Sequence, residues 1–404
     1  MKRFLPILMM FVLIFTCVPC CAGASEITMQ ERETKEETAS VGLSLTAESA
    51  LLMEASSGKV IYENNADVEK PPASVTKVMT MLLIFEDLAA GRISLTDGVT
   101  VSPYAASMGG SQVFLEAGEV QTVDTLLKCI AVSSANDGCV AMAEHLSGSE
   151  EAFVNRMNEK AKELGMEHTH FVNCCGLDAE GHVTTARDIA LMSRELTIKY
   201  PDVFQYTSIW MDEFTHKTNK GESVFGLSST NKLLKQYPGC NGLKTGSTSK
   251  AKFCITATAT KNKISLIAVV MACPDSKSRI RDVSAMFDYG FANVAMYEDE
   301  HPLDDLTELA LTGGKKKTVQ LANPGTFSIA LLKEDMTKEI TKKIRLTDPI
   351  LAPVKEKEVI GEVEYQMDGT VIGTIPIKTL EKVDRMSYGF ALRQIVQRFA
   401  MMPL

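Results

Sequence analysis

The sequence has only one tryptophan and six histidines among its 404 residues, and it has no excess of basic charge. Lys plus Arg number 42 against 51 Asp plus Glu, so the formal net charge is -9. A surface that neutralises nucleic-acid phosphates needs a basic excess, so we expect no nucleic-acid partner. The hydrophobic share of 45% is that of a globular protein and excludes disorder of the whole chain. At about 150 residues per domain, the length predicts two or three domains.

Several motifs that would identify an enzyme class are also missing. No Gly-x-Ser-x-Gly nucleophile elbow occurs, and no phosphate-cradling glycine loop is present. His168, His170, Cys174 and Cys175 lie close together, but their spacing does not match that of common structural zinc sites. We therefore expect no metal and no cofactor.

The first 24 residues have the pattern of an export signal. A short basic start is followed by an apolar run, Leu5 to Val18, which is too short for a full membrane span. Small residues of the kind that a signal peptidase reads then end at Ala24. We predict a cleaved signal peptide at 1–24 and an exported protein; the alternative is a retained N-terminal membrane anchor.

Seven of the ten cysteines follow the predicted signal peptide. An odd number scattered through apolar stretches is not a disulfide framework. We expect each to be a small buried hydrophobe instead. The seven are Cys129, Cys139, Cys174, Cys175, Cys240, Cys254 and Cys273.

The segment 25–41 is polar, acidic and aperiodic, which predicts a flexible linker. Two β-like runs, Ala50–Glu54 and Lys59–Glu63, then indicate a hairpin, and a mostly helical region extends to about residue 199. A second hairpin is predicted at Lys252–Thr258 and Ile264–Ala272, followed by a helix at Asp282–Val294. Since consecutive βαβ alternation is absent, the domain at 42–297 should have a mainly antiparallel sheet in which the N-terminal and C-terminal strands meet.

The pattern becomes all-β from about residue 298. Alternating runs at Thr326–Leu332, Ile340–Leu346 and Val359–Tyr365 indicate strands, and Asp368-Gly369 is a strong hairpin signal. We predict a small β domain at 298–385 and an amphipathic tail at 386–404. One face of that tail carries Tyr388, Leu392, Ile395, Val396 and Phe399, while Arg393 and Arg398 lie elsewhere.

A serine and a lysine that could form a nucleophile and its base occur in Ser74-Val75-Thr76-Lys77. On a helix, residues three apart lie on one side, about 5–6 Å apart at Cβ. A serine hydroxyl is a poor nucleophile at neutral pH, and a lysine held close by can take its proton. By itself such a pair is weak evidence, because helices contain it by chance.

Two further motifs present polar groups at the ends of elements. Ser134 and Asn136 lie between two helical patterns, where a hydroxyl and a carboxamide would face out of a loop. Lys244, Thr245 and Gly246 lead into a predicted strand hairpin, with a cation and a hydroxyl at a strand edge and a glycine that allows close approach of a ligand backbone. Each motif alone has an ordinary structural explanation.

In this order, Ser-x-x-Lys, Ser-x-Asn and Lys-Thr-Gly are the motif set of penicillin-recognising serine enzymes. The chain resembles the low-molecular-weight penicillin-binding proteins, which are serine-type D-alanyl-D-alanine carboxypeptidases, over about residues 42 to 385. The resemblance implies an α+β domain of the transpeptidase/β-lactamase type with an antiparallel sheet and a helical subdomain, a small all-β domain and a C-terminal amphipathic helix. Its supporting stretches are Pro72–Thr80, Thr169–Leu177, Thr184–Ala190 and Gly242–Gly246.

The resemblance also implies roles for the catalytic groups. Ser74 would be the acyl-forming nucleophile and Lys77 its proton acceptor. Ser134 would relay a proton to the leaving D-alanine, and Asn136 would hold the substrate's amide. The oxyanion would lie between backbone N–H groups, one from Ser74 and one from the strand after Gly246.

Substrate binding is implied at the third motif. Lys244, Thr245 and Gly246 would form the site for the terminal carboxylate, which needs a cation and hydroxyl donors, and Arg279 would strengthen it. Asp178 is a weaker candidate for tuning deacylation. Family members often carry histidine directly after Lys-Thr-Gly, whereas Ser247 stands here, so the deacylation rate and the substrate preference stay open.

The predicted function is removal of the terminal D-alanine from peptidoglycan pentapeptide stems through an acyl-enzyme, with covalent binding of penicillin and other β-lactams. A β-lactamase shares the Ser74 and Lys77 chemistry, but it would need efficient water activation and has no use for a β domain and a basic tail. A D,D-endopeptidase fits the same motifs. A non-catalytic penicillin-binding sensor is disfavoured because all three motifs are intact.

The tail suits a membrane surface. Such a helix lets its apolar residues sink below the headgroups while the arginines meet anionic lipid. The alternative is a helix that docks its apolar face on the β domain. We expect a peripheral protein at the outer face of the cytoplasmic membrane, in the cell envelope, or a secreted one.

Overall fold

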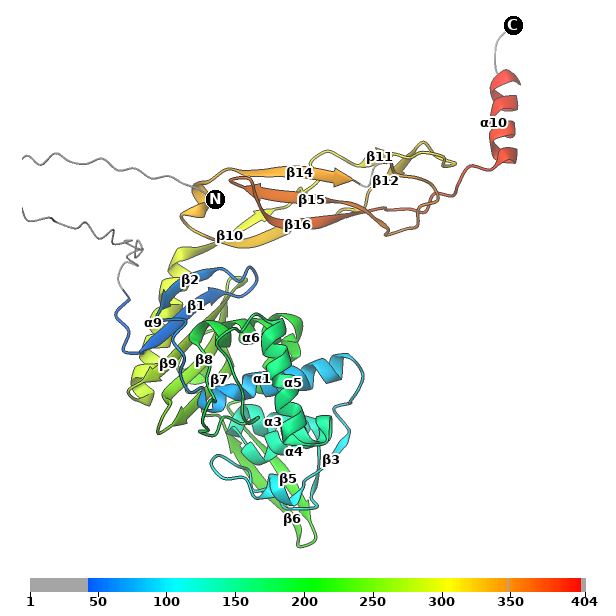
Figure 1. Cartoon of the computed structure of the whole chain (residues 1–404). Helices are drawn as coiled ribbons and strands as arrows, with labels where there is room; N and C mark the ends of the chain where they lie inside the picture. The colour runs from blue at the N-terminus through cyan, green and yellow to red at the C-terminus, as the bar shows by residue number, and fades with distance from the viewer. Residues whose placement is uncertain (1–42, 347–348, 401–404) are drawn as a thin grey trace, which may run out of the picture. The chain divides into compact units, whose positions relative to one another are not determined.

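The structure is a computed structural model that describes residues 43–346 and 349–400. The predicted signal peptide at 1–24 and the predicted linker at 25–41 lie outside the described residues. Figure 1 shows the arrangement of the helices and strands along the chain.

A five-stranded antiparallel sheet organises the first domain, with the strand order β2-β1-β9-β8-β7 (Figure 1). The N-terminal strand β1 pairs directly with β9, which confirms that strands from the two ends of the domain meet. Successive side chains of β1 point to opposite faces of the sheet. All of them are buried, because each face of the sheet has its own hydrophobic core. The strands are β1 Ser49–Glu54, β2 Val60–Asn64, β7 Cys240–Thr248, β8 Lys252–Lys261 and β9 Ile264–Cys273.

Helices pack against both faces of this sheet. Contacts join α6 (Ala186–Lys199) and α9 (Ser276–Asn293) to β9, and the two helices contribute to different cores. The helix α9 begins six residues earlier than the sequence predicts, because Asp275 caps it: its Oδ1 accepts the backbone N–H of Lys277 at 2.8 Å. The remaining helices are α1 Lys77–Ala89, α2 Pro103–Ala106, α3 Val123–Ser133, α4 Asn136–Ser147, α5 Glu150–Glu163, α7 Phe204–Thr207 and α8 Leu233–Gln236, with short 3-10 turns η1 Ala73–Thr76 and η2 Pro201–Val203.

Two small strand pairs interrupt the helical region. One joins β3 (Gly98–Thr100) to β4 (Val120–Thr122), and the other joins β5 (Met211–Thr218) to β6 (Gly221–Ser228). The sequence does not predict the β5–β6 hairpin, because its strands contain few β-branched apolar residues. A cross-strand pair stabilises it: Phe214 lies opposite Phe225, with ring centroids 5.7 Å apart.

The C-terminal part is all-β, as predicted. The hairpin of β15 and β16 turns at Asp368-Gly369, where both residues have a positive φ, +50° and +78°, as a two-residue hairpin turn requires. The predicted boundary at residue 298 falls inside a strand, since β10 begins at Val294. The bounds are β10 Val294–Asp299, β11 Glu308–Ala310, β12 Thr318–Gln320, β13 Phe327–Leu332, β14 Ile340–Leu346, β15 Val359–Met367 and β16 Thr370–Lys378, with a 3-10 turn η3 at Asp335–Thr337.

The last described element is the helix α10, Tyr388–Ala400, at the position where the sequence predicts an amphipathic helix. Within the described ranges, no helix is both long and apolar enough to cross a membrane.

The predicted free cysteines are confirmed: all seven are unpaired and six of them are buried, Cys240 being partly exposed.

Candidate active site

Ser74 and Lys77 meet at the start of α1. Ser74 lies in the turn η1, and the Nζ of the fully buried Lys77 donates to its Oγ at 3.1 Å. The same amine donates to Oδ1 of Asn136 at 2.7 Å and to the carbonyl oxygen of Cys175 at 2.6 Å. Three acceptors from three segments therefore fix the lysine within proton-transfer distance of the serine hydroxyl.

The backbone before Ser74 is held in an uncommon conformation. Ala73 has φ +49°, a value that non-glycine residues rarely adopt. Gly176 packs directly on it, since a Cβ at this glycine would lie 1.9 Å from the carbonyl oxygen of Ala73. Only glycine allows this approach, so the loop that holds Lys77 through Cys175 also presses against the turn that carries Ser74.

The second motif presents its groups from a helix junction. Ser134 ends α3 in the left-handed conformation, with φ +61°, and its buried Oγ has no hydrogen-bond partner among the residues that the structure describes. Asn136 begins α4 and is held on both sides: Oδ1 accepts from Lys77, and Nδ2 donates to the carbonyl oxygen of Gly109 at 2.7 Å. An unsatisfied buried hydroxyl costs free energy, and a substrate atom would relieve that cost.

The third motif lies in β7 at the edge of the sheet. Lys244 is buried, and its Nζ donates to the carbonyl oxygen of Thr245 at 3.1 Å. Burial, together with the nearby charge of Lys77, lowers the pKa of Lys244 well below its usual range. The hydroxyl of Thr245 lies 2.6 Å from that of Thr230. Among the described residues, the buried amine is bonded only to this neutral carbonyl, and such an amine is suited to receive an anion.

Gly246 brings β7 against the nucleophile turn. A Cβ at this position would lie 2.9 Å from the backbone nitrogen of Ser74 and 3.0 Å from the carbonyl oxygen of Pro72. The close approach places the backbone of β7 beside the N–H of Ser74. Two amides at this junction are what an oxyanion hole needs.

Arg279 is buried and is bonded to strand carbonyls. Its Nη1 donates to the carbonyl oxygens of Gly246 at 3.2 Å and Cys254 at 3.0 Å. Burial lowers the pKa of Arg279. Its contacts therefore hold the strand pair β7–β8 in place, and a direct contact with the substrate carboxylate stays a prediction.

Two weaker candidates lie near the same strand. The carboxylate of Asp178 accepts a hydrogen bond from the hydroxyl of Thr248 at 2.8 Å, which ties the loop after Gly176 to the end of β7. Both Asp178 and Ser247 are exposed. Their effect on deacylation stays a prediction.

Among the residues that the structure describes, no group of histidine, cysteine and acidic side chains could hold a metal ion.

Reasoning from the sequence missed His182. Its Nδ1 accepts the backbone N–H of Val172 at 2.9 Å, so Nε2 carries the proton and donates to the hydroxyl of Thr76, also at 2.9 Å. Burial lowers the pKa of His182 to about 4. His182 lies two residues before Thr184, which begins one of the stretches that support the family resemblance. This position was the signal in the sequence that could have pointed to it. Through its contact with Thr76, the neutral ring supports the motif that carries Ser74 and Lys77.

Acid should therefore destabilise the protein through His182. A histidine whose pKa is depressed in the folded state contributes full stability above its unfolded pKa of about 6.5, and that stability falls as the pH drops toward 4. We expect the free energy of unfolding to fall by about 2 kcal/mol between pH 7.5 and pH 5.0 from this group. Urea denaturation at both pH values should show this drop, and His182→Gln should remove it. The exposed His145 gives the control: His145→Gln should keep the wild-type difference, and an equal effect of both variants would contradict the assignment.

Comparison with known proteins identifies the family of the chain. A family model described as D-alanyl-D-alanine carboxypeptidase matches residues 33–275, and one described as the C-terminal domain of penicillin-binding protein 5 matches residues 291–385. The D-alanyl-D-alanine carboxypeptidase DacF of Bacillus subtilis is 40% identical over 392 residues, which is 96% of both chains. DacC of Escherichia coli is 33% identical and covers 84% of this chain and 85% of its own.

Solved structures share the fold. Penicillin-binding protein 5 of Haemophilus influenzae is 30% identical, covers 85% of this chain and 98% of its own, and superposes with a TM-score of 0.64. A peptidoglycan synthesis regulatory factor of Streptococcus pneumoniae is 26% identical and reaches a TM-score of 0.71 over 84% of this chain and 100% of its own. The chain belongs to the D-alanyl-D-alanine carboxypeptidase family of penicillin-binding proteins, the serine hydrolases of peptidase family S11.

Proposed function

We propose that this protein removes the terminal D-alanine from peptidoglycan pentapeptide stems through an acyl-enzyme on Ser74. The observation that carries the proposal is the buried Lys77 amine, 3.1 Å from the Ser74 hydroxyl and fixed there by Asn136 and the carbonyl of Cys175. A positioned base of this kind is what a serine nucleophile requires.

The reaction follows from the arrangement of these groups. Lys77 in its neutral form takes the proton of Ser74, and Oγ attacks the carbonyl carbon of the penultimate D-alanine. The backbone N–H groups of Ser74 and Ser247 stabilise the oxyanion that forms. The C–N bond then breaks while Ser134 relays a proton to the leaving amine. Water finally attacks the acyl-enzyme, which releases the shortened peptide and restores the serine.

Binding of the substrate's end is assigned to β7. The terminal carboxylate meets the amine of Lys244 and the hydroxyl of Thr245, and Arg279 keeps the strand in position through the carbonyl of Gly246. The acyl-side amide meets Asn136. A β-lactam presents a carboxylate and a strained amide to the same groups, so penicillin acylates Ser74 as well. Peptidoglycan as substrate implies a protein exported to the cell envelope.

Release of D-alanine from a pentapeptide ending in D-Ala-D-Ala tests the proposal. The wild-type protein should release it and should be labelled by fluorescent penicillin, whereas Ser74→Ala should abolish both, because no other hydroxyl in the described part of the chain accepts a hydrogen bond from Lys77. Circular dichroism should show that the variant keeps its fold. A stable penicillin adduct on the alanine variant would show that the nucleophile is another residue, and rapid loss of the wild-type adduct without D-alanine release would favour a β-lactamase.

Lys244 should act mainly through the substrate carboxylate. Losing a charge-assisted contact costs about 1.5–3 kcal/mol, so Lys244→Ala should lower kcat/KM for the pentapeptide by about 10- to 100-fold. The variant should lose far less on the same peptide with a C-terminal amide, and its melting temperature should change little. Lys250→Ala, at an exposed lysine in the turn after β7, provides the control and should leave both substrates unaffected. Equal losses of Lys244→Ala on acid and amide would exclude the carboxylate role.

We further propose that α10 binds the membrane surface. The helix has no buried residue, and five of its apolar side chains are exposed, from 49% at Leu392 to 84% at Tyr388; the other three are Ile395, Val396 and Phe399. Removing such a stripe from water is favourable, and the arginines on the other side can meet anionic headgroups. The helix is 13 residues long, so binding should be modest and salt-sensitive.

Liposome co-sedimentation tests the membrane proposal. The mature protein should sediment with anionic vesicles at low salt and be released at high salt, and deletion of 387–404 should abolish sedimentation. Replacing Ile395 and Phe399 together by serine should have nearly the same effect while keeping the arginines. If the full-length and shortened proteins stay equally in the supernatant at low salt, α10 is not a membrane anchor.

A further inference from the structure

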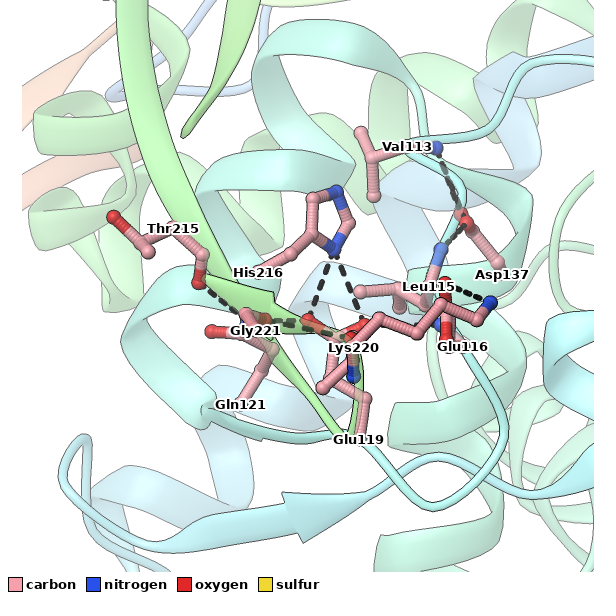
Figure 2. Close-up of polar contacts among 11 residues, drawn as sticks. Val113, Leu115, Glu116, Glu119, Gln121, Asp137, Thr215, His216, Lys220 and Gly221 are labelled. Carbon is pink, nitrogen blue, oxygen red and sulfur yellow. Dashed lines mark hydrogen bonds and ion pairs between the residues drawn. The ribbon is translucent and has the colours of Figure 1, made fainter. Parts of the chain in front are cut away.

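Asp137 is a buried acidic residue to which the proposed reaction gives no role. It follows Asn136 in the first turn of α4, and only 1% of it is exposed. Its carboxylate accepts the backbone N–H of Val113 and of Leu115, each at 3.1 Å (Figure 2). Both donors lie more than 20 positions earlier in the chain. Asp137 therefore ties the start of α4 to the loop at 109–115.

This loop has an uncommon backbone conformation at Phe114, between the two donors. Phe114 has φ +60°, a value that a bulky residue rarely adopts, and 62% of the residue is exposed. Strained backbone persists only where the surrounding contacts enforce it. The hydrogen bonds from Val113 and Leu115 enclose Phe114 on both sides, so the carboxylate of Asp137 keeps the loop in this shape.

The same loop orients the side chain of Asn136. Its Nδ2 donates to the carbonyl oxygen of Gly109 at 2.7 Å, and its backbone N–H donates to that of Ser111 at 2.8 Å. The fit is close, because a Cβ at Gly110 would lie 2.8 Å from Nδ2. A carbonyl oxygen can only accept a hydrogen bond, so the loop selects the amide nitrogen and leaves Oδ1 directed at the amine of Lys77, 2.7 Å away.

The chain after this loop has an anchor of its own. The buried carboxylate of Glu119 accepts the backbone N–H of Glu116 at 2.9 Å and lies 2.9 Å from Nδ1 of His216 in β5 (Figure 2). These contacts do not involve Asp137. Loss of the Asp137 carboxylate should therefore release the part of the loop beside Asn136 and leave the part beyond Glu116 in place.

We propose that Asp137 is a positioning residue for the acylation of Ser74. It acts through the loop, which orients the carboxamide of Asn136, which in turn holds the amine of Lys77 beside the serine hydroxyl. The inference rests on the proposed function, because it concerns the same acylation step. Since the substrate carboxylate is assigned to β7, loss of Asp137 should lower the rate of acylation more than the affinity for the ligand.

The time course of labelling by fluorescent penicillin measures both quantities. Asp137→Ala should lower the rate constant of acylation by about 10- to 100-fold, because a small misplacement of a catalytic group has an effect of this size. The dissociation constant of the complex that precedes acylation should change by less than about threefold. Asp137→Asn keeps one acceptor oxygen for the loop, so its rate constant should stay within about fivefold of the wild-type value.

Asp282 provides a matched control for a loss of stability alone. It is also 1% exposed, and its carboxylate accepts the backbone N–H of Thr46 at 2.7 Å and of Ala47 at 2.9 Å, in contacts of α9. Asp282→Ala should lower the melting temperature as Asp137→Ala does. Below both melting temperatures it should acylate at the wild-type rate. An equal loss of rate in the two variants would overturn the positioning role.

A double-mutant cycle tests whether Asp137 acts through Asn136. Asn136→Ala should slow acylation, and adding Asp137→Ala should slow it by less than about twofold more, because the two residues act in one chain of contacts. If Asp137→Ala does not fold, the smaller loss in Asp137→Asn should likewise disappear in the Asn136→Ala background. Losses that multiply would overturn the inference.

The wild-type protein separates this inference from the proposed function. If it is not labelled at all, both proposals are refuted. If it is labelled and Asp137→Ala is labelled equally fast, the role of Asp137 is refuted and the proposed function stands.

Discussion

The buried amine of Lys77 is the contact on which the rest of the site depends. A charged or polar nitrogen without exposure to water must find acceptors, and this one takes them from Ser74, Asn136 and the carbonyl of Cys175. These groups belong to three segments that are far apart in the sequence. The need to satisfy one amine thus brings together the nucleophile turn, the start of α4 and the loop before Gly176.

Close backbone approach is the second constraint. Gly176 lies against the carbonyl of Ala73, and Gly246 lies against the N–H of Ser74, at distances that leave no room for a Cβ. The turn η1 is therefore clamped between a loop and the edge strand β7. Because such contacts involve backbone on both sides, they fix Ser74 more rigidly than side-chain packing would, and they leave its amide next to that of β7.

Buried polar groups of this domain differ in how completely they are hydrogen-bonded. Some buried groups accept hydrogen bonds from the backbone of neighbouring segments and so act as positioning groups. These are Asp137, Glu119 and His182. The hydroxyl of Ser134 has no partner among the described residues, and the amine of Lys244 has only a neutral carbonyl. Buried groups left in this state are stabilised when a ligand supplies the missing atoms.

The sequence by itself determined the order of the elements and the three motifs. The short β-like and apolar runs of β1 and β9, the turn at Asp368-Gly369 and the helical spacing in α10 are local patterns, so they could be predicted directly. The resemblance to a known family then assigned the motifs to one site. What stayed open were features with no local signal, such as the β5–β6 hairpin and the early start of α9.

Only the tertiary structure decided which distant groups meet. The neutral His182 behind Thr76, the contact of Arg279 with strand carbonyls and the network that holds Phe114 all join residues many positions apart. No periodicity encodes such contacts, because they arise from the packing of whole elements against each other. The reaction class could therefore be predicted from the sequence, whereas the shape of the site around it required the fold.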